Sequence, residues 1–225
     1  MLIEVVAKLV LLGIGVAISP VAVIAAILLL VSPGGRAKAS LFVAGWVLAL
    51  AVVGGVAVAV EGALGIGDAA DPTRIVAVIA LALGVVLLVF GILRWRGRPA
   101  PGDDEPTPGW MTAVDAATPA RALGLGALLA VAKPKNLVLT LAAATAISEP
   151  TVSTAGSAVA LAAYLVVASV SVATPLVVAV ALGDRAGPVL ERWKVSLVAR
   201  NKAIMAVVLI GFGLLLVGKG VTGLV

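Results

Sequence analysis

The sequence predicts an all-α integral membrane protein with six transmembrane helices, arranged as a 3+3 inverted repeat in which the first and fourth helices are broken. Of the 225 residues, 62% are hydrophobic and the mean hydropathy is +1.24, whereas soluble domains are nearer about 45–50% apolar. Several apolar runs are long enough to cross a bilayer, which takes about 20 residues. Two prolines in similar settings, Pro20 and Pro134, lie 114 residues apart, close to half the chain.

Six apolar runs define the predicted spans. In order, they cover residues 9–31, 41–60, 75–93, 123–147, 155–182 and 203–218. The fourth run is interrupted at its centre by Lys133-Pro134-Lys135-Asn136, and the other five carry no charge. We expect a first three-helix repeat over residues 1–98 and a second over 121–225, within one membrane domain. The segment 99–120, which is rich in proline, is expected to be a cytoplasmic linker.

The same short pattern occurs in both halves. In the first half, Ile18-Ser19-Pro20 is followed by an apolar run, by Ser32-Pro33 and by a span that contains Trp46. In the second half, Ala132-Lys133-Pro134 is followed by an apolar run, by Ser148-Glu149-Pro150 and by a span that contains Tyr164. Each half contributes three spans. Because this number is odd, the second half enters the membrane from the opposite side and the repeat is inverted. Inverted repeats are typical of secondary transporters.

The distribution of Lys and Arg predicts the orientation of the chain. Eleven of these residues fall in the odd-numbered loops and three in the others. Cytoplasmic loops carry the excess of positive charge, so both termini are expected outside the cytoplasm. The same bias accounts for the net charge of +5 without a nucleic-acid partner.

The two proline breaks form the candidate site. Proline frees backbone carbonyls in the preceding turn, and these need partners in protein or water. A Lys near the bilayer centre costs about 2.5–3.5 kcal/mol, and a broken helix lining a wet cavity explains Lys133 and Lys135. On a continuous helix, Lys133 and Asn136 share a face and Lys135 points elsewhere. The candidate substrate-binding residues are Ser19, Pro20, Lys133, Pro134, Lys135, Asn136 and, in the fifth span, Thr174.

Other interpretations of these segments stay open. If residues 123–132 form a re-entrant segment, both lysines lie at the cytoplasmic interface. In the fifth span, hydroxyls such as Thr174 beside Pro175 often satisfy carbonyls of their own helix. Residues 185–202 are expected to be a solvated cytoplasmic loop anchored by Trp193, or a short helix that Pro188 opens along the headgroups.

The two breaks and the six-span layout resemble the lysine-exporter (LysE) superfamily. Within it, the chain resembles the GAP family of glycolipid- or sulfolipid-addressing proteins, in the stretch from Ser32-Pro33-Gly34-Gly35 through Lys38 to Gly45-Trp46 and in Trp193 followed by Asn201-Lys202. The resemblance implies a bacterial inner-membrane transporter for an envelope glycolipid, partners in lipid synthesis and export, and a homodimer. Lys133 departs from the superfamily, which commonly has Asn there.

Three functions are consistent with these features of the sequence. The first is export of an anionic or amphipathic envelope glycolipid, with the lysines engaging its head group. The second is proton-coupled export of an amino-acid-like solute, with a buried lysine as the proton carrier. The third is a membrane scaffold that docks lipid-synthesis enzymes on its basic loops. An enzyme is not expected, because the chain has no His and no Cys and no acidic residue inside a predicted span. No metal or cofactor is expected either.

Overall fold

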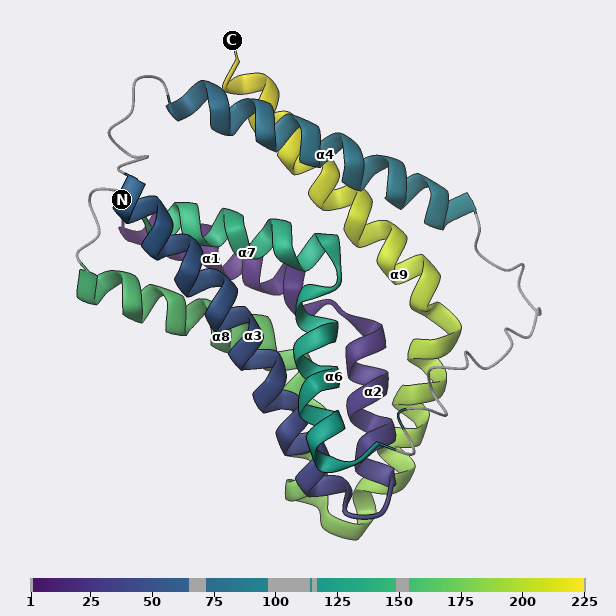
Figure 1. Ribbon diagram of the computed structural model, residues 1–225. Coiled ribbons are helices and arrows are strands. Elements are labelled where there is room, and N and C mark those ends of the chain that lie inside the picture. Colours follow the sequence, from purple (N-terminus) through teal and green to yellow (C-terminus); the bar gives the residue numbers. More distant parts are fainter. Residues whose placement is uncertain (1, 65–71, 97–113, 115–116, 149–153, 225) are drawn as a thin grey trace.

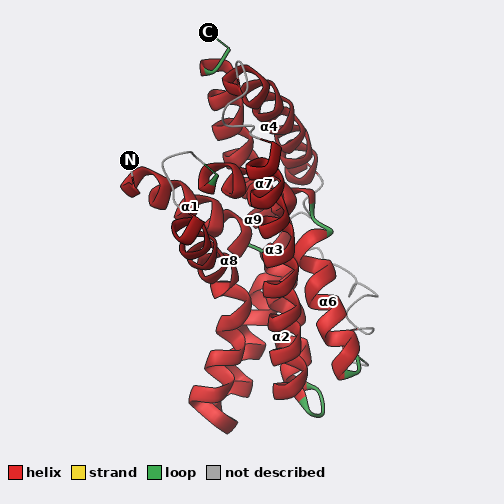
Figure 2. Cartoon of the chain, turned by 60° about the vertical axis from the view of Figure 1, so that its left-hand side comes forward, coloured by secondary structure: helices red, strands yellow, loops and turns green. Residues whose placement is uncertain are grey.

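The computed structural model describes residues 2–64, 72–96, 114, 117–148 and 154–224. Within these residues the regular structure is helical throughout and no strand occurs (Figure 2). The elements are α1 (Leu2–Ala17), α2 (Pro20–Val31), α3 (Gly35–Leu64), α4 (Pro72–Arg96), α6 (Pro119–Val131), α7 (Pro134–Ile147), α8 (Thr154–Leu182), the short 3-10 helix η1 (Gly183–Arg185) and α9 (Ala186–Thr222). Most of the expected linker 99–120 lies outside the described residues, and its end at Pro119 opens α6.

Both expected breaks are present as bends between two helices. The axes of α1 and α2 differ by 59°, and those of α6 and α7 by 72°. Each outgoing helix begins with a proline at its first position, Pro20 in α2 and Pro134 in α7. Proline is favoured there because its missing N–H has no partner within the helix in any case. Each bent pair fits either a broken span or a re-entrant loop.

The described residues supply fewer spans than the six expected from the sequence. Three stretches are long and apolar enough to cross a membrane: Gly35–Gly62, Ala155–Arg200 and Ala203–Thr222. The count rises to five if each bent pair is one span. The expected span 75–93 lies within α4, whose apolar stretch among the described residues is the shorter Leu81–Leu93.

The expected loop over residues 185–202 is wrong. The chain turns in η1, where Gly183 adopts a positive φ of 54°, and α9 then runs without interruption from Ala186 to Thr222. Pro188 does lie in the first turn of a helix, as one interpretation expected. That helix continues because no proline follows in it, and its 37 residues correspond to about 55 Å at about 1.5 Å per residue.

The bent pairs meet at the centre of the molecule (Figure 1). The helix α3 packs along α6, and α8 packs along α1. The helix α4 packs mainly on α9, whereas α9 also packs on α2. In Figure 1, α4 and the C-terminal part of α9 lie side by side. Both termini lie at the end of the molecule opposite to the α2–α3 turn and η1. The bends therefore lie deep within the helical body.

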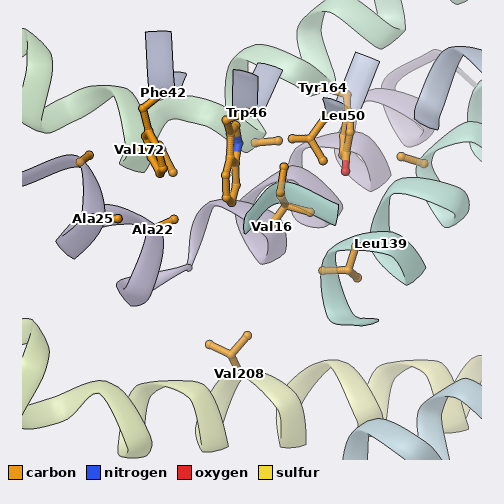
Figure 3. Close-up of a cluster of buried hydrophobic side chains, with 14 of the residues drawn as sticks. Val16, Ala22, Ala25, Phe42, Trp46, Leu50, Leu139, Tyr164, Val172 and Val208 are labelled. Carbon is orange, nitrogen blue, oxygen red and sulfur yellow. The ribbon is translucent and has the colours of Figure 1, made fainter. Parts of the chain in front are cut away.

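The core contains both aromatic residues that mark the repeat. Trp46 of α3 and Tyr164 of α8 are fully buried and belong to one cluster with Phe42, Val16 and Leu139 (Figure 3). The cluster joins helices of both halves around the bends. Its packing explains why the two halves are held together as one unit.

Glycines allow backbones to touch at two contacts between helices. A Cβ on Gly126 of α6 would lie 1.9 Å from the Phe42 carbonyl oxygen, and one on Gly45 of α3 would lie 2.0 Å from that of Leu123. Along α4 and α9 the close glycines repeat every seven residues, as Gly84 and Gly91 on one helix and Gly213 and Gly220 on the other. Such small-residue contacts are typical of helix packing in membranes.

Candidate functional site

The N-termini of two half-helices meet at the bends. Ser19 precedes α2 and Lys133 precedes α7, and both are N-cap residues whose side chains make no capping hydrogen bond to their own helix. Instead, the Lys133 Nζ donates a hydrogen bond to the Ser19 Oγ, with a distance of 2.7 Å between the two atoms. We call the contact region formed by Ser19, Pro20, Lys133, Pro134, Lys135 and Asn136 the basic junction.

Lys135 makes the second connection between the halves. Its side chain is only 2% exposed, and its Nζ donates to the carbonyl oxygens of Gly15 and of Ile18, the latter at 3.1 Å. These carbonyls lie at the C-terminal end of α1. The last carbonyls of a helix lack partners within it and carry about half a negative charge. This end of α1 therefore compensates the buried ammonium group.

Asn136 stabilises the bend of its own half. Its Nδ2 donates to the Ala130 carbonyl oxygen at 2.8 Å, across the bend from α7 back to α6. Its Oδ1 is buried without a hydrogen-bond partner. Lys133 and Asn136 do not act as a pair on one helical face, because Lys133 stands outside α7. Lys135, expected to point elsewhere on a continuous helix, reaches the first half.

A polar chain runs from the basic junction into the core, and the sequence did not predict it. The Thr140 Oγ1 donates to the Asn136 carbonyl oxygen at 2.7 Å and lies 2.9 Å from the Tyr164 hydroxyl oxygen. All three side chains are buried. The available signal was Tyr164 itself, which is the only tyrosine in the chain and falls in an apolar span. Buried tyrosine hydroxyls usually need a partner.

Thr174 lies away from the basic junction. Its Oγ1 donates to the Val170 carbonyl oxygen of the same helix at 2.6 Å. It lines an open groove of about 370 Å³ together with Val23, Ser171, Trp193, Ser196 and Leu197. The structure thus brings together six of the seven expected site residues and leaves Thr174 in this groove.

The basic junction brings basic side chains and helix N-termini together. It combines the side-chain amino groups of Lys133 and Lys135 with the N-terminal ends of α2 and α7, which carry partial positive charge. Helix N-termini with nearby cations are suited to bind anions. Within the described ranges, no group of three or more His, Cys, Asp or Glu side chains is placed to hold a metal ion. The junction therefore offers hydrogen-bond donors and the partial positive charge of two helix N-termini.

These features define a helical membrane protein in which two bent helix pairs meet at a basic, polar centre. The chain belongs to the family described as "Sap, sulfolipid-1-addressing protein", whose family model matches residues 9–222. This match confirms the resemblance to the sulfolipid-addressing proteins. No curated protein and no solved structure matches the chain significantly.

Proposed function

We propose that the protein is a transporter of the LysE superfamily that moves an anionic, amphipathic envelope glycolipid across the inner membrane toward the cell surface. The observation that carries the proposal is the hydrogen bond between Lys133 and Ser19, which joins the N-termini of two half-helices from opposite halves of the chain. Transporters place substrate sites at such broken helices, with helix N-termini directed at anionic groups.

The helix contacts support the six-span inverted repeat. Ser19 and Lys133 occupy equivalent positions, since each precedes a proline at the start of an outgoing half-helix. A contact between equivalent residues is expected where a two-fold axis passes through the site. In the repeat, α1 corresponds to α6 and α3 corresponds to α8. The same axis would therefore turn the contact between α3 and α6 into the contact between α8 and α1, and both contacts occur. It would also exchange α4 and α9, which pack on each other.

The family's name supports an anionic lipid as the substrate. A sulfolipid carries a sulfate group, whose negative charge and acceptor oxygens suit lysine side chains and helix N-termini. The half-buried Lys133 is the residue we assign to the head group. Lys135, which is buried and bonded to α1, is assigned to hold the bend in place beside it.

The position of basic residues supports an orientation with both termini outside the cytoplasm. The α2–α3 turn, the start of α6 and η1 lie at the end of the molecule opposite to both termini (Figure 1). These segments contain or adjoin Arg36, Lys38, Arg121 and Arg185. The excess of positive charge would place this end in the cytoplasm.

The test measures total and surface-exposed sulfated lipids in cells of a sulfolipid-producing bacterium from which this protein is deleted. The deletion is complemented with wild type, Lys133→Ala or Lys38→Ala. Lys38 is a matched control because its Nζ also donates to a serine, the Ser32 Oγ at 3.2 Å, but outside the basic junction. Immunoblotting of membranes checks that each variant is present in equal amount.

We expect Lys133→Ala to lower the surface fraction of the lipid about tenfold, as the loss of about 1.4 kcal/mol of head-group binding requires, with total lipid unchanged. Lys38→Ala should restore wild-type exposure. An unchanged surface fraction in the deletion strain would contradict the proposal. A defect that follows only from neutralising the basic residues of 185–202 would instead favour the scaffold.

A further inference from the structure

The groove that contains Thr174 is formed by three helices. Val23 belongs to α2, Ser171 and Thr174 to α8, and Trp193, Ser196 and Leu197 to α9. Its volume of about 370 Å³ is near the lower end of the range of small-ligand sites. The groove is open, and its lining is mainly apolar with three hydroxyl groups. This size suits part of an amphipathic molecule.

Two hydrogen bonds connect this groove to the bend between α1 and α2. The Val23 N–H donates to the Ser19 carbonyl oxygen at 3.2 Å, so the groove begins one helical turn, about 5.4 Å, from Ser19. The Ser171 Oγ donates to the Ala17 carbonyl oxygen, the last residue of α1. The inner end of the groove is therefore built from the same bend that accepts the Lys133 ammonium group.

A second groove on α3 and α6 offers a comparison within the same molecule. Its volume is about 320 Å³, and its lining has no side-chain oxygen or nitrogen. The lining residues are Gly45, Leu48, Ala49, Val52, Val53, Leu123, Ala127 and Val131. Any lipid tail can cover such a surface. The α2–α8–α9 groove differs in having hydroxyls, a tryptophan and exposed Arg192 and Arg200 on the same helix as Trp193.

We propose that the α2–α8–α9 groove binds one acyl chain of an anionic lipid whose head group is held at Lys133. The inference rests on the proposed function, since it takes the head group to be at the basic junction. The groove is open rather than enclosed, so the remaining chains would stay in the membrane while the head group passes through the protein. Trp193 lines the groove and is 37% exposed. The exposed Arg192 and Arg200 on the same helix favour anionic lipids at this surface of the protein.

The experiment uses the purified full chain in phosphatidylcholine vesicles that contain a trace of a photoreactive lipid. The probe is phosphatidylglycerol with a diazirine on one acyl chain, compared with phosphatidylcholine bearing the same chain. Labelled peptides are quantified by mass spectrometry. We expect the anionic probe to label α2 and residues 190–200 about fivefold more than the neutral probe, and both probes to label residues 45–53 of α3 equally.

Two variants that fill the groove test the assignment. Thr174→Trp and, at the exposed rim, Ser196→Trp should each abolish the preference for the anionic probe, whereas Val52→Trp in the α3–α6 groove should leave it unchanged. Circular dichroism and thermal melting check that all three variants are folded. Equal labelling by both probes in wild type, or a preference that survives both groove variants, would overturn the proposal.

The outcomes separate this inference from the proposed function, because labelling requires no transport. A selective label in the groove, combined with normal lipid exposure in Lys133→Ala cells, supports the groove and rejects the transport role of the basic junction. An exposure defect in those cells without selective labelling supports transport and rejects the groove.

Discussion

The two bends have similar backbone conformations but differ in the charge of their side chains. Each has an N-cap residue with a non-helical backbone followed by a proline, and their angles are 59° and 72°. The first bend is neutral, and Ser19 there is 1% exposed. The second has two lysines, of which Lys133 is half-buried and Lys135 is buried, next to an exposed Pro134.

The difference shows how the halves depend on each other. The first bend supplies acceptors, namely the Ser19 hydroxyl and the carbonyls of Gly15 and Ile18, and the second supplies the ammonium donors. A lysine in a membrane protein needs such partners because water is scarce. Neither bend satisfies its polar groups alone. The junction is therefore held together by complementary, rather than identical, side chains.

The largest effect on stability is expected when a lysine is introduced into the first bend. Ser19→Lys would put a second ammonium group beside Lys133 Nζ, and two like charges about 4 Å apart repel by about 4 kcal/mol at an effective dielectric constant of about 20. We expect a loss of thermal stability of that size in detergent. Adding Lys133→Ser exchanges the two side chains and should recover about half of the loss, because a Lys–Ser pair can form again. No recovery in the double variant would contradict the equivalence of the two positions.

A smaller loss of stability is expected when the carbonyl groups at the end of α1 lose Lys135 as their hydrogen-bond donor. Lys135→Ala removes the hydrogen bonds to Gly15 and Ile18 and leaves a cavity, which should lower the free energy of unfolding by about 2–3 kcal/mol. Lys135→Met keeps most of the volume and should cost about 1–2 kcal/mol less than the alanine variant. Thermal melting in detergent measures both. Equal stabilities of all three proteins would show that the buried ammonium group does not stabilise the bend.

The hydrogen bond between the bends should be measurable as a coupling energy. In a double-mutant cycle of Ser19→Ala and Lys133→Ala, we expect an interaction of about 1 kcal/mol, the usual contribution of one such bond. A parallel cycle on Lys38 and Ser32 provides the reference for a lysine–serine pair outside the junction. Additive effects at Ser19 and Lys133 would contradict the contact.

The smallest effects are expected at the prolines. Pro20→Ala and Pro134→Ala keep the first helical position and should each cost about 0.5–1 kcal/mol through the freedom of the unfolded chain. Pro20 is buried and Pro134 is exposed, so Pro20→Ala should be the more harmful through lost packing. Melting temperatures of the two variants test this order. The reverse order would mean that the second bend depends more on its proline than its exposure suggests.

The bends themselves were predictable, but the partners of their side chains were not. The effect of proline on the backbone is confined to the neighbouring helical turn. Pro20 and Pro134 therefore indicate where α2 and α7 begin without knowledge of the fold. The partner of Lys135 was missed because helical spacing assumes an unbroken helix, and the chain is bent one residue before that lysine's helix starts. Thr174 was grouped with the site because it lies near a proline in a span. Its actual place depends on how α8 packs against α2 and α9.

By itself, the sequence determined the helical membrane class, the positions of both breaks and the family. The class follows from composition, the breaks follow from proline, and the family follows from short motifs and a family model that matches residues 9–222. Only the tertiary structure decided that Lys133 meets Ser19, that Lys135 is compensated by the end of α1, and that α9 is continuous. The physical reason is distance along the chain. Backbone bends are local, whereas a buried cation takes whichever carbonyls the packing of remote helices brings within reach.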